Sequence, residues 1–165
     1  MEPATLILHI RYSRWATGRV LDAVRTVPPE DLSKDLGSSY GSILGTLHHI
    51  YQGDRIWFAR LQGQPTGKLS EFEPPAGFAA FEKEWLGLGD RLVAWSEGLP
   101  LERWTEVIAY RDTTGTPFQT PARQIVLHLV NHATYHRGQV TTLLRQLGHP
   151  VVGTDLIAYY RSLEK

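Results

Sequence analysis

The sequence predicts an all-α protein, namely a four-helix bundle with a small β-hairpin before its last long helix. Two observations point to this fold class. In four long segments, apolar residues recur every three or four positions, which is the spacing of an amphipathic helix. Between the third and the fourth of these segments lies one short stretch in which apolar and polar residues alternate, as they do in a strand. Because the 165 residues contain no visible repeat or linker, we expect one domain over residues 1–165.

The expected elements follow one another with short connections, and prolines and glycines mark most of their ends. In chain order they are a helix over residues 4–27, a turn or minor helix over 29–34, a helix over 43–61, loop to about residue 77, a helix from 78 to 98, strands over 104–110 and 116–119, a helix from 120 to 148 and a short helix over 155–162.

The first two long helices are bounded by residues that start or stop helices. Pro28 and Pro29 end the first one, because proline cannot continue a helix. Residues 37–42, rich in glycine and serine, supply an N-cap for the second helix, and Gly63 with Pro65 closes it.

The third helix, the hairpin and the fourth helix have equally local signals. Large apolar residues keep helical spacing in the third helix until Gly98 ends it. Aspartate and glycine in residues 112–115 turn the chain between the two expected strands. We expect the Thr120 hydroxyl to cap the fourth helix, with Pro121 at its first position and Gly148 just past its end.

The composition excludes several classes of function. Seventeen Lys and Arg balance seventeen Asp and Glu, so the chain has no net charge that would attract nucleic acid or an anionic membrane. It has no cysteine, which excludes disulfides, thiolate ligands and a sulfur nucleophile of its own. No apolar run reaches the roughly 18 residues of a membrane span, and the start of the chain lacks a basic leader. We therefore expect a cytoplasmic protein that acts on a small molecule.

Three histidines lie four residues apart in the last long helix: His128, His132 and His136. Residues four apart share one face of a helix, so either neighbouring pair can reach one ion. His128 and His136 cannot do so together, because they are separated by about 12 Å of helix rise. A mononuclear site therefore needs a ligand from elsewhere. The spacing alone is equally compatible with ordinary hydrogen-bonded histidines, and Ala133 stands where a zinc protease has its general-base glutamate.

The second helix offers two candidates for the third ligand, His48 and His49. Adjacent residues are about 100° apart around a helix, so only one of them can face the pair. The apolar face of the helix lies slightly nearer His48. Gly45 and Gly53, four residues before and after His49, instead clear space beside that residue. The residues by themselves favour His49 and leave His48 open.

Several short motifs of the chain are shared with one protein family. They are His49 and Ile50 followed by Asp54 and Trp57, the pair Asn131 and His132, the run His136, Arg137, Gly138 and Gln139, and segments near residues 12–16 and 154–161. Together they resemble the DinB family, a damage-inducible group related to the YfiT-like thiol transferases. The resemblance spans nearly the whole chain, and its most specific part is the run from His132 to Gln139.

The resemblance implies a four-helix bundle, often a homodimer, that holds one divalent metal ion, zinc or nickel above all. Its ligands would be His49, His132 and His136, with His128 as a neighbour. Three neutral histidines leave a coordination position free for water or substrate. Asp54 is the candidate catalytic residue, because it could orient a ligand histidine or accept a proton; the alternative is a surface ion pair.

The candidate substrate-binding residues are Arg137, Trp57 and Tyr12. An exposed arginine beside the bundle end is the alternative for Arg137. The leading functional hypothesis is a metal-dependent enzyme of the thiol S-transferase type, in which the ion activates a low-molecular-weight thiol. The alternatives are a metal-dependent hydrolase, a non-catalytic stress protein that binds metal or a small ligand, and a bundle without any site. Neither nucleic acid nor a membrane is an expected partner.

Overall fold

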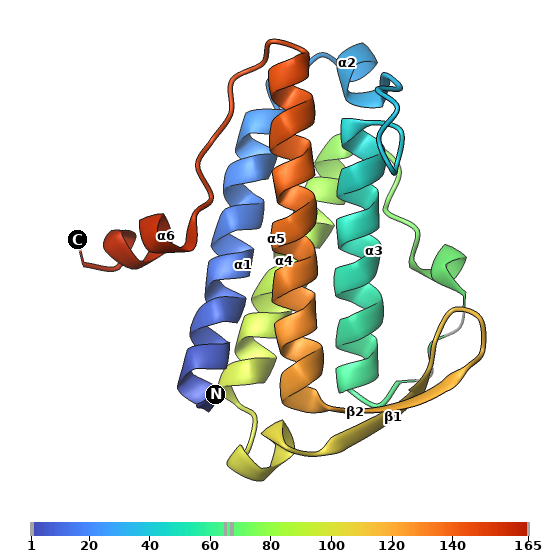
Figure 1. Cartoon of the computed structure of the whole chain (residues 1–165), viewed down its shortest axis with the longest axis vertical. Coiled ribbons are helices and arrows are strands. Elements are labelled where there is room, and N and C mark those ends of the chain that lie inside the picture. Colours follow the sequence, from blue (N-terminus) through green and yellow to red (C-terminus); the bar gives the residue numbers. More distant parts are fainter. Residues whose placement is uncertain (1, 65, 67, 165) are drawn as a thin grey trace.

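The computed structural model describes the chain except for residues 1, 65, 67 and 165, so Pro65 lies outside the described residues. Its main feature is a bundle of long helices that run side by side (Figure 1). These helices are α1 (Pro3–Val24), α3 (Ile43–Leu61), α4 (Phe78–Glu97) and α5 (Ala122–Gln146). The expected all-α bundle with a hairpin before its last long helix is confirmed.

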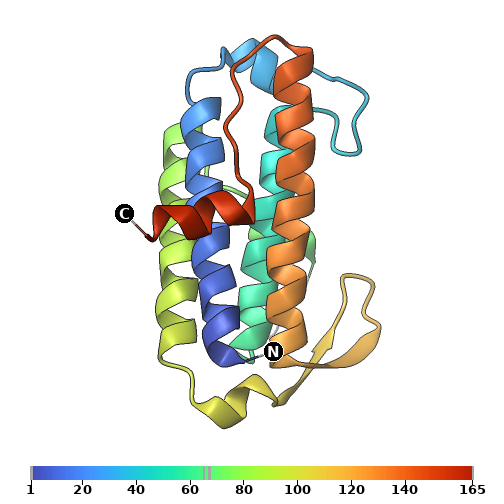
Figure 2. The ribbon, with the colours of Figure 1, turned by 60° about the vertical axis from the view of Figure 1, so that its left-hand side comes forward.

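Shorter elements connect and cover the long helices. They are α2 (Pro29–Ser33), the 3₁₀ turns η1 (Leu69–Phe72) and η2 (Leu101–Trp104), the strands β1 (Val107–Arg111) and β2 (Pro117–Pro121), and α6 (Leu156–Ser162). The chain returns from the end of α5 along the outside of the bundle, and α6 then lies across α1 (Figure 2). No helix among the described residues is long and apolar enough to cross a membrane.

The core explains how the site is placed. Helix α3 packs most extensively against α5, and α1 packs against α4 and α5. Leucine, isoleucine and aromatic side chains from all four helices form one buried cluster, and burying each such side chain stabilises the fold by about 1.5–3 kcal/mol. The close α3–α5 pair brings the histidine-bearing segments of the two helices face to face.

Local signals placed most boundaries correctly. The Ser42 hydroxyl caps α3 by accepting a hydrogen bond from the Gly45 N–H at 3.0 Å. Gly63 and Gly148 follow α3 and α5 with φ of +70° and +76°, a conformation that favours glycine. Helix α1 ends at Val24, three residues before the expected end, because the chain turns there and buries Val27 in the core.

Three expectations near the loops and the hairpin are wrong. The segment before residue 77 is not entirely loop, because it contains η1. Trp104 lies in η2 rather than in the first strand, since that turn buries its ring in the core. Thr120 does not cap α5: it lies in β2, paired with Ile108, and its hydroxyl contacts that of Tyr110 at 3.2 Å. The helix therefore begins at Ala122, with Pro121 as its N-cap residue.

Candidate metal centre

Three histidine side chains converge between α3 and α5. His49, His132 and His136 each offer a nitrogen atom, and these atoms all lie within 4.8 Å of one another. The Nε2 atoms of His49 and His132 are 2.9 Å apart. A tetrahedral ion with metal–nitrogen bonds of about 2.0–2.1 Å separates its ligands by about 3.4 Å. The distances between the three nitrogens are therefore close to those between the ligands of a single ion.

A missing side chain on α3 makes this convergence possible. A Cβ atom added at Gly53 would lie 2.8 Å from Cε1 of His132, closer than real Cβ contacts allow. Only glycine lets the imidazole lie directly against the neighbouring helix at this point. Gly45, expected to clear space in the same way, instead makes room for the Tyr40 carbonyl oxygen, which a Cβ would approach to 2.1 Å.

Gln139 holds the third histidine in a fixed orientation. The Nδ1 atom of His136 lies 2.7 Å from the Gln139 Oε1 atom, one turn further along α5. An amide oxygen can only accept, so Nδ1 carries the proton and Nε2 keeps the lone pair that a metal needs. Gln139 belongs to the run of residues from His136 that resembles the family, but the sequence pattern predicts no role for it. Its spacing of three residues from His136 was the signal that could have identified it.

Burial keeps two of the histidines neutral. Desolvation, together with the neighbouring His136, lowers the pKa of His49 to about 4. Desolvation lowers the pKa of His132 to about 3, with His136, His49 and His128 acting in the same direction. Neutral imidazoles are the form that binds metal ions. Among the described residues the group contains no carboxylate, and an all-nitrogen donor set suits zinc, nickel, cobalt or iron. These residues fit a divalent transition-metal ion.

Tyr40 contacts this group from the loop before α3. Its ring is stacked on the His49 ring, with centroids 3.9 Å apart and planes 15° apart. Its hydroxyl lies 2.8 Å from Nε2 of His49. Tyr40 is not among the predicted site residues, because the sequence of its loop indicates only a cap for the following helix.

Comparisons with known proteins show the family and the fold of this chain. The sequence profile of the DinB family matches residues 1–164. The chain belongs to the DinB family. It is similar to Protein DinB of Bacillus subtilis strain 168, with 25% identity over 155 residues, which cover 90% of this chain and 89% of the relative. It also has the fold of a DinB-like protein from Bacillus cereus ATCC 10987, with a TM-score of 0.63, 21% identity, and coverage of 84% of this chain and 90% of that chain.

The other two histidines near this DinB site face different neighbours. The His48 ring packs edge-on against Phe81, with centroids 5.0 Å apart. The His128 ring packs against Trp57 at 4.9 Å and lies 5.7 Å from His132. The structure therefore groups His49, and not His48, with the histidines of α5.

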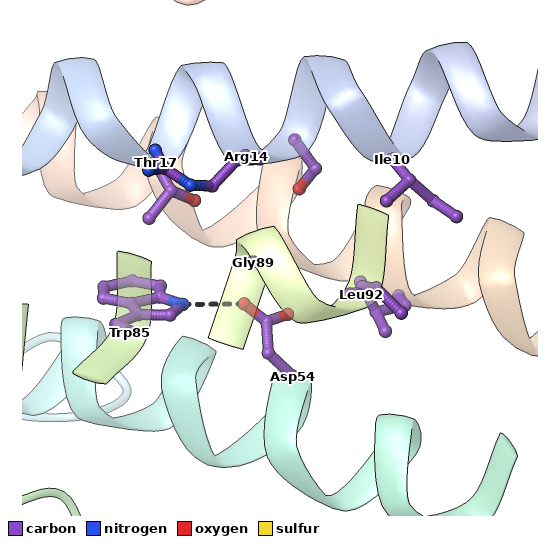
Figure 3. Close-up of a pocket in the computed structure, with 9 residues that line it drawn as sticks. Ile10, Arg14, Thr17, Asp54, Trp85, Gly89 and Leu92 are labelled. Atoms are coloured by element: carbon purple, nitrogen blue, oxygen red, sulfur yellow. Dashed lines mark hydrogen bonds between the residues drawn. The ribbon is translucent and has the colours of Figure 1, made fainter. Parts of the chain in front are cut away.

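Asp54 lies inside the bundle and not beside the histidines of this DinB-family chain. Its Oδ2 atom accepts a hydrogen bond from Trp85 Nε1 at 2.8 Å, and its Oδ1 atom is buried without a partner (Figure 3). Burial raises the pKa of this carboxyl to about 7. Its carboxylate thus has no hydrogen bond or ion pair with the three converging histidines, with Arg55 or with the buried Arg60. Its catalytic role stays a prediction without a supporting contact.

The candidate substrate-binding residues lie in two different surroundings. Arg137 is only 1% exposed, so the alternative of an exposed arginine beside the bundle end is wrong. It donates hydrogen bonds to Ser13 and Thr134 and lies over the Tyr12 ring. The Tyr12 hydroxyl in turn donates to the Thr154 carbonyl oxygen at 2.8 Å. Trp57 packs against His128, on the side of α3 that faces the hairpin. Substrate binding by these residues stays a prediction.

Proposed function

We propose that this DinB-family protein binds one divalent metal ion, zinc or nickel, through His49, His132 and His136, and that it catalyses transfer of a low-molecular-weight thiol. The observation that carries the proposal is the convergence of three imidazole nitrogens within 4.8 Å at the α3–α5 contact. When bound, such an ion supplies a Lewis acid that keeps a thiol ionised at neutral pH.

The chain's own residues supply position rather than a nucleophile. The chain has no cysteine, so the sulfur must come from a small molecule. Gly53 lets His132 approach α3, and Gln139 orients His136. Three protein ligands leave a coordination position for the thiol, as in catalytic rather than structural zinc sites. The thiol S–H bond breaks and its proton goes to solvent. The sulfur then forms a bond to an electrophilic carbon of the acceptor while the bond from that carbon to its leaving group breaks, and the leaving group departs with that electron pair.

Metal content tests the first part of the proposal. Protein purified without an affinity tag, then dialysed against zinc or nickel, is expected to hold about one ion per chain in elemental analysis. His49→Ala, His132→Ala and His136→Ala are expected to lose it, because two imidazoles bind far more weakly than three. His128→Ala is the matched control and should keep the ion, since its ring lies on Trp57. A wild-type chain without metal would refute the site.

Thiol consumption tests the second part. The metal-loaded protein is incubated with a panel of bacterial thiols and an electrophilic acceptor, and loss of free thiol is measured against metal-free protein and His136→Ala. If free thiol disappears at the uncatalysed rate in all samples, the proposed thiol transfer is refuted. The proposed metal site is not affected by that result.

A second candidate is a non-catalytic protein that binds metal or a small ligand in a stress response. One observation favours it: the group of described metal-binding residues contains no carboxylate, and the only expected general base, Asp54, contacts Trp85 in the core. Metal-dependent hydrolysis needs such a base more than thiol transfer does, since water is harder to ionise than a thiol. If the metal-loaded protein hydrolyses ester substrates and His136→Ala does not, that result would support a metal-dependent hydrolase.

A further inference from the structure

The Tyr40 hydroxyl occupies an unusual position beside a ligand nitrogen. Nε2 of His49 lies 2.8 Å from this hydroxyl and 2.9 Å from Nε2 of His132. A neutral imidazole has a single nitrogen lone pair. A cation at the three histidines takes that lone pair, so the hydroxyl then needs another acceptor close by.

Backbone contacts fix the loop around Tyr40, and with it the point from which the phenol extends toward His49. The Tyr40 carbonyl oxygen accepts a hydrogen bond from the Ser42 N–H at 2.8 Å and lies over Gly45, where a Cβ would come within 2.1 Å. Gly41 has a φ of +72°, which favours glycine, and its carbonyl oxygen accepts from the Leu36 N–H at 2.8 Å. These backbone contacts place the side chain beside His49, and the ring stacking and the hydroxyl contact with His49 keep it there.

Tyr40 also lies between the histidines and solvent. Its ring contacts His49 face to face and His136 edge-on, with centroids 5.4 Å apart in the second case. It is 37% exposed, whereas His136 is 7% exposed. A small molecule that approaches the histidines from this side therefore passes the phenol.

We propose that Tyr40 is a positioning residue of the metal centre: its hydroxyl donates a hydrogen bond to the anionic sulfur, oxygen or nitrogen atom of the small ligand that completes the ion's coordination. The inference rests on the proposed metal site and adds a specific residue for the ligand's orientation. The inference also identifies the class of ligand: its coordinating atom must keep a second lone pair, which accepts the hydrogen bond from the Tyr40 hydroxyl.

Azide binding to the cobalt-loaded protein tests this role. Cobalt gives visible absorption bands that respond to an added ligand, and azide is a small anion with a lone pair left after coordination. Tyr40→Phe keeps the stacked ring and removes only the hydroxyl. We expect it to bind cobalt at one ion per chain and azide about tenfold more weakly, which is the effect of losing one hydrogen bond to a charged group.

Tyr135→Phe is the matched control. The Tyr135 ring also packs edge-on against His136, with centroids 4.9 Å apart, but it is 65% exposed and has no described hydrogen bond to a ligand nitrogen. It should bind azide as the wild type does. Unchanged azide affinity in Tyr40→Phe would overturn the inference and leave the metal site standing. A wild-type protein that binds no cobalt would overturn both.

Discussion

At the scale of single residues, the absence of a side chain is as decisive as the presence of an imidazole. Gly53 lies in the middle of α3, where glycine costs about 0.5–1 kcal/mol relative to alanine. The position of the His132 ring, whose Cε1 would lie 2.8 Å from an added Cβ, accounts for that cost. Helix α3 is therefore less stable than it could be at the point where His132 of α5 lies against it.

Gly53→Ala is expected to weaken zinc binding about tenfold or more, because displacing a ligand from its geometry costs at least as much as losing an outer contact. The helix itself should gain stability from alanine. Zinc affinity is measured by competition with a chromogenic chelator, and thermal unfolding is followed alongside.

The matched control for this substitution is Gly138→Ala. Gly138 also lies within a helix, two residues from His136, but a Cβ there would meet nothing within 4 Å. It should gain helix stability and bind zinc as the wild type does. Equal zinc affinity in both variants would show that the contact at Gly53 does not control the site.

Asp54 is a second residue whose surroundings set its behaviour. Its carboxyl borders a cavity of about 20 Å³ that Ser13 and Thr17 also line, which is room for about one water molecule. Burial raises its pKa from 3.8 to about 7, while the Trp85 hydrogen bond and the charge of Arg137 oppose that rise. The folded protein therefore keeps a proton on Asp54 at pH values where the unfolded chain has lost it.

The free energy of unfolding should consequently fall as pH rises through the window from about 4 to about 7 and level off above it. His49 and His132 act in the opposite sense, because their lowered pKa values reduce stability as pH falls below their ordinary value of 6.5. Comparison with Asp54→Asn removes their effect, since both proteins contain them.

Denaturant unfolding at several pH values measures this difference. Relative to Asp54→Asn, the wild type should lose about 2–3 kcal/mol between pH 5 and pH 8, at about 1.4 kcal/mol per pK unit. A difference between the two proteins that is independent of pH would show that Asp54 is ionised in the fold at pH 5.

At the scale of elements, the predictable features were those that depend on nearby residues. Helix α3 has the expected bounds, because its periodicity, its Ser42 cap and the glycine at its end all lie within the segment. The start of α5 was wrong for the opposite reason. Thr120 has the local signature of a cap, but pairing of β2 with β1 carries the strand up to Pro121 and extends the backbone at Thr120.

The residues of the site also differ in whether the nearby sequence could predict them. The pair His132 and His136 follows from spacing on one helix, and the choice of His49 followed from the glycines and the family resemblance. Tyr40 was not predictable, because its position depends on a loop whose path is set by the Gly45 contact and the Ser42 hydrogen bond. Arg137 was misplaced since a charged residue is rarely buried without a paired charge, whereas here hydroxyl groups and the Tyr12 ring surround it.

At the scale of the whole molecule, the metal site would join the two helices that pack most closely. His49 lies on α3, and His132 and His136 lie on α5. An ion held by all three would link His49 to His132, which are 83 positions apart in the chain. Assembly of two such chains into a homodimer stays a prediction, as does the absence of nucleic-acid binding expected from the balanced charge.

Because the unfolded chain has no such arrangement of histidines, metal binding should raise the thermal midpoint of unfolding. At a free metal concentration of 100 times the dissociation constant, the gain is about 2.7 kcal/mol. For a chain of this size that corresponds to about 5–10 °C. We expect this shift with zinc or nickel in calorimetry. Magnesium, which prefers oxygen ligands, should leave the midpoint unchanged. His132→Ala should show no zinc shift, since it removes the central ligand of the group; an equal shift in that variant would mean that zinc binds elsewhere on the protein.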